Sequence, residues 1–344
     1  MNKYALLLNP GHNRVYYKSS QQLSAVELSI VAQALESRPL EIRSEQLCGV
    51  YYLTFTTEVP LSQKDLAKLS RLSFAFALYQ VEGELLRPLE LPCLDLTAVS
   101  ISSQLKYIGK TNELFTRMMI NVAAASYAGP EPERIALLDP IAGKGTTLFE
   151  GLDMGFDCYG IEISDKSAAE GYHYLKKYLE IQRLKHTTDL QKQSGPNKSF
   201  TAKRYGVELA KTKEDFKAHR QQHWEIVSGN SMYADRFYQK NKFHVLVGDL
   251  PYGVQHGNVS GDKQLSRSPR ELIETCLPAW RNVLKPGGVL TLAWNTYVFP
   301  KEQFAELLTQ GGFEVLREGP YDQFAHWVDN AIMRDVIVAR KPAR

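Results

Sequence analysis

Two acidic residues of this 344-residue chain follow apolar runs at a spacing that suits a nucleoside ligand. Asp139 opens the segment DPIAGKGTT, in which Gly143 and Gly145 let a ligand approach the backbone and a helix start offers free N–H groups. The glycines fit neither a Walker phosphate loop nor the GxGxxG pattern. Glu162 ends the next apolar run, 23 residues further on, where doubly wound folds bind ribose hydroxyls. The pair predicts a site for a nucleoside-containing cofactor.

A second acidic segment, DLPYG, suits chemistry on an aromatic amino group. Methylating such a group is difficult because its lone pair is delocalised into the ring. A carboxylate and a main-chain carbonyl that accept hydrogen bonds from the two N–H groups draw the lone pair outward, and an aromatic ring stacks on the base. We expect Asp249 to supply the carboxylate, Leu250 the carbonyl and Tyr252 the ring, while Pro251 fixes the turn.

The elements that position these residues alternate from Arg134 onward between apolar runs and helical patterns, which predicts a parallel sheet. The helix that starts at SPRE carries an N-cap Ser268, Pro269 at its first position and Glu271 three residues on, and it ends at KPGG. The predicted strands cover 134–140, 157–163, 223–230, 243–253, 288–295, 313–318 and 331–341, and the helices between them cover 146–154, 165–184, 268–284 and 300–310.

Residues 1–92 have a different pattern, which predicts a small α+β domain. Its expected strands are 4–9, 14–18, 50–57 and 85–91, and its expected helices are 24–35 and 62–78. Residues 93–133 form a bridging segment with a helix over 112–128, and residues 134–344 form the sheet domain. The N-terminal domain has no residues that suggest catalysis, so we expect it to position something for its neighbour.

Basic charge is concentrated in one insertion. The composition, 44% hydrophobic and 23% charged, is that of a folded globular chain, and the net charge of +3 is too small to attract polyanions over the whole surface. Residues 183–223 hold ten Lys or Arg and four Asp or Glu, a local charge of +6. We expect an exposed insertion that is partly disordered or helical. It is either a solvated charge run or a phosphate-binding surface, with interleaved aromatic residues that stack on bases: Phe200, Tyr205, Phe216 and Trp224.

Other features bound the function by exclusion. The four cysteines are far apart and lack the spacing of a metal site or a disulfide framework. The N-terminus has no signal-peptide pattern, and no apolar run approaches 18 residues. We therefore expect a cytoplasmic protein that uses neither a metal nor a membrane.

The motifs DPIAGKGTT, YGIEI, DLPYG and LKPGG, in that order, resemble those of class I S-adenosylmethionine (SAM)-dependent methyltransferases, within the amino-methylating group that has a (D/N)PPY motif. KYIGKTNELFTRMMINVAAA and the ending DNAIMRDVIVARK further resemble the THUMP-associated tRNA guanosine 2-amino methyltransferases. The resemblance covers about residues 105 to 342. It implies a Rossmann-like seven-stranded sheet with a terminal antiparallel hairpin, SAM as cofactor, and RNA, in particular tRNA, as partner.

The resemblance also implies roles for individual residues. Asp139, Gly143 and Gly145 would face the methionine part of SAM, and Glu162 its ribose. The remaining cofactor contacts it implies are Ile163 against the adenine, Asn230 on the adenine amino group with Ser231 and Met232 nearby, and Lys110, Thr111 and Asn112 over the methionine end.

Three departures leave alternatives open. Leu250 stands where the family has proline, Lys144 adds a positive charge to the glycine loop, and the N-terminal domain is shorter than the family's two-part RNA-binding region. We expect methylation of an exocyclic amino group of a base in RNA, guanosine in tRNA first. The alternatives are a DNA adenine amino-methyltransferase and a nucleic-acid-binding scaffold with an idle methyltransferase fold.

Overall fold

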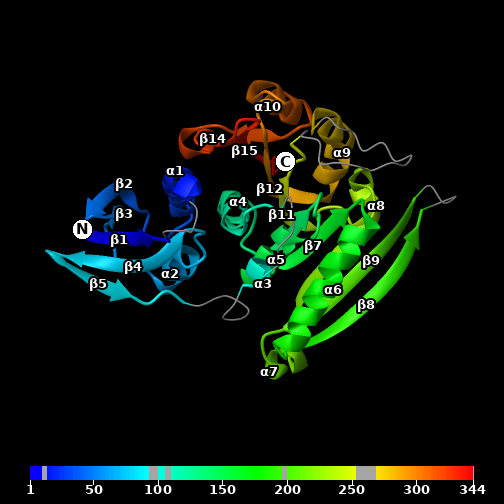
Figure 1. Ribbon diagram of the computed structural model, residues 1–344, viewed down its shortest axis with the longest axis horizontal. Coiled ribbons are helices and arrows are strands. Elements are labelled where there is room, and N and C mark those ends of the chain that lie inside the picture. Colours follow the sequence, from blue (N-terminus) through cyan, green and yellow to red (C-terminus); the bar gives the residue numbers. More distant parts are fainter. Residues whose placement is uncertain (10–13, 93–99, 105–109, 196–199, 253–268, 344) are drawn as a thin grey trace.

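A computed structural model describes residues 1–344 except 10–13, 93–99, 105–109, 196–199, 253–268 and 344. The predicted N-cap Ser268 lies outside the described residues. The chain forms two sheets, of five and ten strands, with helices between them (Figure 1).

The ten-stranded sheet contains the predicted seven-stranded arrangement. Its order is β13-β15-β12-β11-β6-β7-β10-β9-β8, and β14 pairs with β15. The central strands are parallel, whereas β15 runs antiparallel to β12 and β13. The chain therefore has a Rossmann-like class I methyltransferase fold, and the predicted terminal antiparallel hairpin is confirmed. The strands are β6 (Ala136–Asp139), β7 (Asp157–Glu162), β8 (Lys185–Ser194), β9 (Thr201–Ala210), β10 (Gln222–Ser228), β11 (Phe243–Asp249), β12 (Leu284–Asn295), β13 (Glu314–Leu316), β14 (His326–Asp329) and β15 (Ile332–Arg340).

Alternating side chains of these strands enter two separate cores, one on each face of the sheet. Leu137 and Val245 belong to the first core, whereas Leu138 and Leu246 belong to the second. The first core includes residues of α4 (Glu113–Ser126), α5 (Thr146–Asp153) and α6 (Asp165–Ile181). The second includes residues of α8 (Ala234–Phe237), α9 (Pro269–Val283) and α10 (Lys301–Gln310). The shorter helices are α3 (Ile101–Gln104), α7 (Lys213–Lys217), η2 (Ser231–Tyr233) and η3 (Gly319–Asp322).

The N-terminal sheet is antiparallel, with the order β2-β3-β1-β4-β5. Its first six elements follow the β-α-β-β-α-β order of ferredoxin-like domains. They are β1 (Asn2–Leu8), α1 (Arg14–Ala32), β2 (Leu40–Leu47), β3 (Val50–Thr57), α2 (Gln63–Leu69) and β4 (Ala75–Glu82), followed by β5 (Leu85–Leu89). The predicted α+β character is confirmed.

Three details of the N-terminal prediction are wrong. Residues 14–18 begin α1 rather than a strand, because no Gly, Pro or Asn interrupts the segment from Arg14 to Ala32. The helix predicted over 62–78 ends at Leu69, and the alternating residues 75–82 form β4. Strand β2 was not predicted, because most of its residues are exposed at the sheet edge and carry no apolar alternation.

The basic insertion is an ordered hairpin. Strands β8 and β9 pair with each other, and β9 extends the sheet beside β10 (Figure 1). The expectation of a disordered or helical insertion is wrong for these strands: Tyr205, Val207 and Leu209 alternate along β9 and are buried, a strand signal that the charge count concealed. Among the described residues of the insertion, the helical part is α7.

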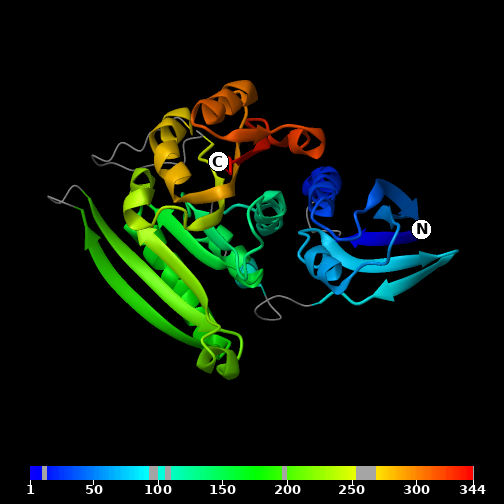
Figure 2. The ribbon, with the colours of Figure 1, turned by 180° about the vertical axis from the view of Figure 1, so that it is seen from behind.

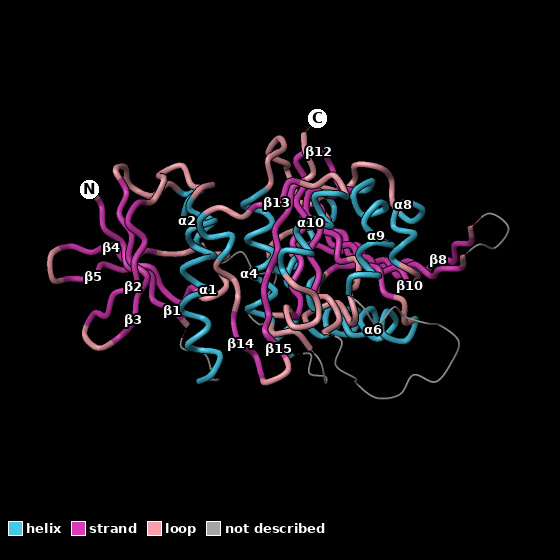
Figure 3. Tube along the Cα trace, turned by 90° about the horizontal axis from the view of Figure 1, so that it is seen from above, coloured by secondary structure: helices cyan, strands magenta, loops and turns pink. Residues whose placement is uncertain are grey.

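The hairpin and the N-terminal sheet lie at opposite ends of the molecule in both views (Figures 1 and 2). Helices α1 and α4 lie side by side between the two sheets (Figure 3). At this joint the buried Glu27 of α1 accepts hydrogen bonds from Asn121 of α4 and from the backbone and hydroxyl of Ser73. Burial raises the pKa of Glu27 to about 7. One core cluster continues across the joint, so the N-terminal domain is packed against the sheet domain.

Within the described ranges, no helix is both long and apolar enough to cross a bilayer. The same residues contain no group of three or more His, Cys, Asp or Glu side chains that could hold a metal ion.

Candidate functional site

The segment after β6 forms a tight loop whose backbone conformation requires glycine. Gly143 has φ 55°, and no atom lies within 4 Å of the position that a Cβ would take. Gly145 has φ 95° and begins α5 without a side-chain cap. Asp139, at the end of β6, is 3% exposed and accepts a hydrogen bond from the Ile141 N–H at 3.0 Å. The loop thus leaves open space beside its backbone, with a carboxylate next to it.

Glu162, at the end of β7, holds this loop. Its two carboxylate oxygens accept hydrogen bonds from the Gly143 N–H at 2.9 Å and the Ser164 N–H at 2.8 Å. Each oxygen keeps a further lone pair that a ribose hydroxyl could use. Ile163 follows directly and is half-buried. Sequence spacing alone placed Asp139 and Glu162 together, and the pairing of β6 with β7 brings the two strand ends side by side.

The residues after β10 complete this side. Asn230 is exposed, and its side chain accepts a hydrogen bond from the Met232 N–H. Ser231 is buried, and its hydroxyl accepts from the Trp280 indole N–H at 2.9 Å, so its side chain has a structural partner. Met232 is half-buried. Among the three, Asn230 has the side chain most accessible to a ligand.

The carboxylate of Asp249 lies at the end of β11, in the same edge of the sheet. Its Oδ2 accepts a hydrogen bond from the Thr111 hydroxyl at 2.7 Å, and its Oδ1 accepts from the Tyr252 hydroxyl. Thr111 precedes α4 and is 138 residues away in sequence, so the fold brings the two together. The resemblance implies that Thr111 contacts the cofactor. In the structure its hydroxyl contacts Asp249, the predicted catalytic carboxylate.

Tyr252 and Leu250 are held around this carboxylate. Leu250 is 1% exposed, and its N–H donates to the Ala293 carbonyl at 2.9 Å. Pro251 is exposed. The Tyr252 ring lies against the Arg334 guanidinium, with 5.0 Å from the guanidinium carbon to the ring centroid. The Tyr252 ring, which we expect to stack on the base, therefore already contacts a cation, Arg334, that was not identified from the sequence.

Three carboxyl groups influence one another at this edge. Burial, together with the charges of Asp249 and Glu162, raises the pKa of Asp139 to about 7. Burial also raises the pKa of Glu162 and of Asp249. The positive charge of Arg334 opposes this rise in the pKa of Asp249, as do the hydrogen bonds that Asp249 accepts from the Tyr252 and Thr111 hydroxyls. The edge therefore gathers three carboxyl groups, whose ionised forms favour a cationic ligand.

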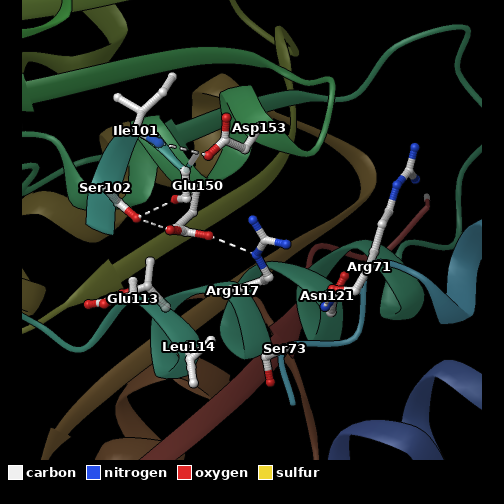
Figure 4. Close-up of polar contacts among 12 residues, drawn as sticks. Arg71, Ser73, Ile101, Ser102, Glu113, Leu114, Arg117, Asn121, Glu150 and Asp153 are labelled. Carbon is white, nitrogen blue, oxygen red and sulfur yellow. Dashed lines mark hydrogen bonds and ion pairs between the residues drawn. The ribbon is translucent and has the colours of Figure 1, made fainter. Parts of the chain in front are cut away.

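A buried polar network holds the segment that carries Thr111 (Figure 4). The carboxylate of Glu150 on α5 accepts from Arg117 Nε of α4 at 2.8 Å and from the Ser102 hydroxyl of α3. Lys110 Nζ donates to the Ser102 carbonyl at 2.6 Å and pairs with Glu113. These bonds fix both ends of the connection between α3 and α4.

Asn112 is the N-cap of α4, since its side chain accepts from the N–H groups of Leu114 and Phe115. The predicted roles of Lys110 and Asn112 at the methionine end remain predictions, while their side chains are engaged in these local contacts. Lys144, expected near the cofactor, pairs with Glu170 on α6 at 2.6 Å.

The sequence analysis missed Arg117, Glu150, Arg334 and Phe115. Glu150 and Arg117 lie on two helices whose apolar periodicity indicated only a core face. Arg334 lies within the strand of the resembling C-terminal segment, where nothing in its spacing indicated contact with Tyr252. The buried charge of Glu150 in an apolar helix face was the one available signal.

No protein-family model matches the sequence, and no curated protein matches it. Solved structures do match the fold. The magnesium protoporphyrin IX methyltransferase ChlM from Synechocystis PCC 6803, solved with bound SAM, is 13% identical, and the match covers 66% of this chain and 79% of that one with a TM-score of 0.37. A TehB-like SAM-dependent methyltransferase from Corynebacterium glutamicum is 13% identical over 61% of this chain and 82% of that one, with a TM-score of 0.34.

The [4+2]-cyclase SpnF also matches, with 16% identity, a TM-score of 0.38, and coverage of 67% of this chain and 81% of that one. The reaction of this chain has to be inferred from its own residues.

Proposed function

We propose that this protein is a SAM-dependent methyltransferase that acts on an exocyclic amino group of a base in RNA, with guanosine in tRNA as its substrate. The observation that carries the proposal is the convergence of two differently built carboxylate sites on one sheet edge. Glu162 and the glycine loop fit a nucleoside, and Asp249 with Tyr252 fits an aromatic amine.

The residues present fit SAM. The space beside Gly143 would receive a ligand against the backbone, Glu162 and Asn230 would hold the ribose and adenine, and the buried carboxyl groups would favour a cation. When bound, SAM supplies an electrophilic methyl group on a positively charged sulfur.

The chain's own residues prepare the amino group. Asp249 accepts a hydrogen bond from one amino N–H, and we expect the Leu250 carbonyl to accept the other, so that the nitrogen lone pair turns out of the base plane. Because both oxygens of Asp249 accept from hydroxyl groups in this structure, the amino group would bind at a remaining lone pair or displace the Tyr252 hydroxyl. As the new N–C bond forms, the bond between the methyl carbon and sulfur would break and leave its electron pair on sulfur, and the proton would leave the amino nitrogen toward Asp249 or solvent.

The RNA partner is supported by the resemblance and by the net charge of the basic insertion. Some of its charges are already paired: Lys203 with Asp165, Arg204 with Glu225, and Arg220 with Asp215. Tyr205 and Trp224 are buried, so these two rings do not serve as exposed stacking platforms. Lys185 and Lys192 of β8 are exposed and remain the better candidates for phosphate contacts.

The test incubates the purified protein with methyl-labelled SAM and, separately, unmodified tRNA, ribosomal RNA and duplex DNA, then identifies the labelled nucleoside by mass. We expect label on guanosine in tRNA. Asp249→Ala should lower the rate about 1000-fold, because it removes the carboxylate that polarises the amino group, with SAM binding within a few-fold of wild type.

The other outcomes separate the alternatives. Label on adenine in DNA would favour the DNA amino-methyltransferase, which uses the same geometry. Absence of both label and SAM binding would favour the scaffold protein. Full activity of Asp249→Ala would contradict the assigned role of this carboxylate.

A further inference from the structure

A buried arginine, Arg334, lies near the predicted catalytic carboxylate Asp249. It lies on β15 opposite Asn295, the last residue of β12, and is 7% exposed. Its position is therefore at the same edge of the sheet as Asp249, whose partner residue on β12 is Ala293. Within the described part of the chain, its Nε is buried without a hydrogen-bond partner.

Two aromatic rings hold the guanidinium. Its carbon lies 4.6 Å from the centroid of the Phe115 ring and 5.0 Å from that of Tyr252. Such contacts stabilise a cation without using its N–H groups, which point outward in the guanidinium plane. The guanidinium also donates a hydrogen bond to the Tyr252 hydroxyl, whereas its Nε has no partner among the described residues.

The charge of Arg334 reaches Asp249, since it opposes the rise of that residue's pKa. This edge of the sheet therefore presents the Asp249 carboxylate as an acceptor and the Arg334 guanidinium as a donor, close to each other. His326 on β14 pairs with Arg334, and its ring packs on Phe115. Its Nε2 is a second buried atom that has no partner among the described residues. Leaving a buried donor unpaired costs stability, and a polar ligand atom would offset that cost.

We propose that Arg334 is a specificity-determining residue, which donates a hydrogen bond to the ring nitrogen next to the amino-bearing carbon of the substrate base. The inference rests on the proposed function, and it identifies which side of the substrate base the protein recognises. In guanine that nitrogen is N3, next to the 2-amino group, and in adenine it is N1, next to the 6-amino group. An aliphatic amine lacks this acceptor and would leave the donor buried and unpaired, so the site would reject it.

The first test needs no methyl transfer. Wild-type protein labelled with ¹⁵N at arginine Nε is titrated, in the presence of S-adenosylhomocysteine, with guanosine 5′-monophosphate, its 3-deaza analogue and ribose 5-phosphate. The Nε–H signal of Arg334 is assigned by its loss in Arg334→Lys. We expect guanosine monophosphate to shift this signal, and neither the 3-deaza analogue, which has C–H in place of N3, nor ribose 5-phosphate to do so.

An equal shift with the 3-deaza analogue, a shift with ribose 5-phosphate, or no shift with any nucleotide would overturn the proposal. A shift with adenosine monophosphate in place of guanosine monophosphate would support the contact of Arg334 and contradict guanosine as the substrate. The two proposals can therefore fail separately.

Kinetics supply the second test. Arg334→Gln should lower kcat/KM by about 10- to 100-fold, mainly through KM, because a charge-assisted hydrogen bond to the base is lost. Arg334→Lys keeps the charge but not the oriented donor, so it should not restore activity. Full recovery in Arg334→Lys would mean that Arg334 acts only through the charge of Asp249, and would overturn the proposed contact.

The control is Arg340→Gln. Arg340 lies at the other end of the same strand and donates to the Ser126 carbonyl. This variant should leave kcat/KM unchanged. A loss equal to that of Arg334→Gln would mean that both substitutions act by disturbing β15.

Discussion

The two halves of the sheet edge use their carboxylates differently. On the half that we propose binds the cofactor, at the ends of β6 and β7, Glu162 accepts from backbone N–H groups within the same local unit, at Gly143 and Ser164. On the acceptor half, at the ends of β11, β12 and the start of β15, Asp249 accepts from side-chain hydroxyls and lies near a distant arginine. The first half is built by backbone and the second by side chains.

The difference has consequences for function. Backbone donors cannot be exchanged by substitution, which suits a cofactor that stays the same. Side chains from separate segments, such as Thr111 and Arg334, can change without disturbing the strand–loop–helix unit of the other half. We infer that the cofactor half fixes the reaction and that the acceptor half fixes the substrate.

The separation predicts that damage to one half should leave the other working. Glu162→Ala should weaken SAM binding about 100-fold, because charge-assisted hydrogen bonds to the ribose are lost, while kcat at saturating SAM stays within a few-fold of wild type. Isothermal titration with SAM measures the affinity. This is the reverse of the pattern expected for Asp249→Ala.

Glu170→Gln is the matched control for Glu162→Ala. Glu170 pairs with Lys144 at the outside of the same loop, and its loss should leave SAM affinity unchanged. If Glu162→Ala instead lowered kcat and spared affinity, the division of the edge into two halves would be wrong.

A pH dependence sharpens the comparison, since burial raises the pKa of Asp139 on the cofactor half to about 7. The ionised carboxylate attracts the SAM cation, so affinity should fall about tenfold between pH 8 and pH 6 as protons compete. S-adenosylhomocysteine, which lacks the sulfonium charge, should change less, and Asp139→Asn should flatten the SAM profile. If SAM affinity depended equally steeply on pH in Asp139→Asn, the proton that competes with SAM would belong to another group.

The same pKa has a consequence for stability. A carboxyl group whose folded pKa is raised keeps its proton after the unfolded chain has released it. Asp139 should therefore make the ligand-free protein less stable as pH rises from about 4 toward 7.

The cofactor half was also the easier half to predict from sequence. Asp139, the two glycines and Glu162 lie within 24 consecutive residues, so a local spacing rule brings them together. Asp249 could be identified from its own motif, but Thr111 and Arg334 are distant from it in sequence. The packing of α4 on β11 brings Thr111 near, and the pairing of β11 with β12 and of β12 with β15 brings Arg334 near. The hairpin was missed for a related reason, because its strands are polar on one side and are specified by the free edge of β10.

The smallest expected effect tests whether the cofactor half depends on backbone shape. Gly145 and Gly155 both have positive φ, 95° and 84°, and flank the same helix, α5. Replacement by alanine should cost about 1 kcal/mol of unfolding free energy at either position, since a Cβ disfavours this conformation. Only Gly145→Ala should also weaken SAM binding, by a few-fold, because Gly145 lies in the loop that borders the ligand space.

Gly155→Ala thus serves as the internal control, measured by chemical denaturation and by SAM titration on both variants. Equal loss of affinity in the two variants would mean that binding follows overall stability. Loss confined to Gly145→Ala would mean that the loop backbone itself forms part of the cofactor site, as the open space beside Gly143 implies.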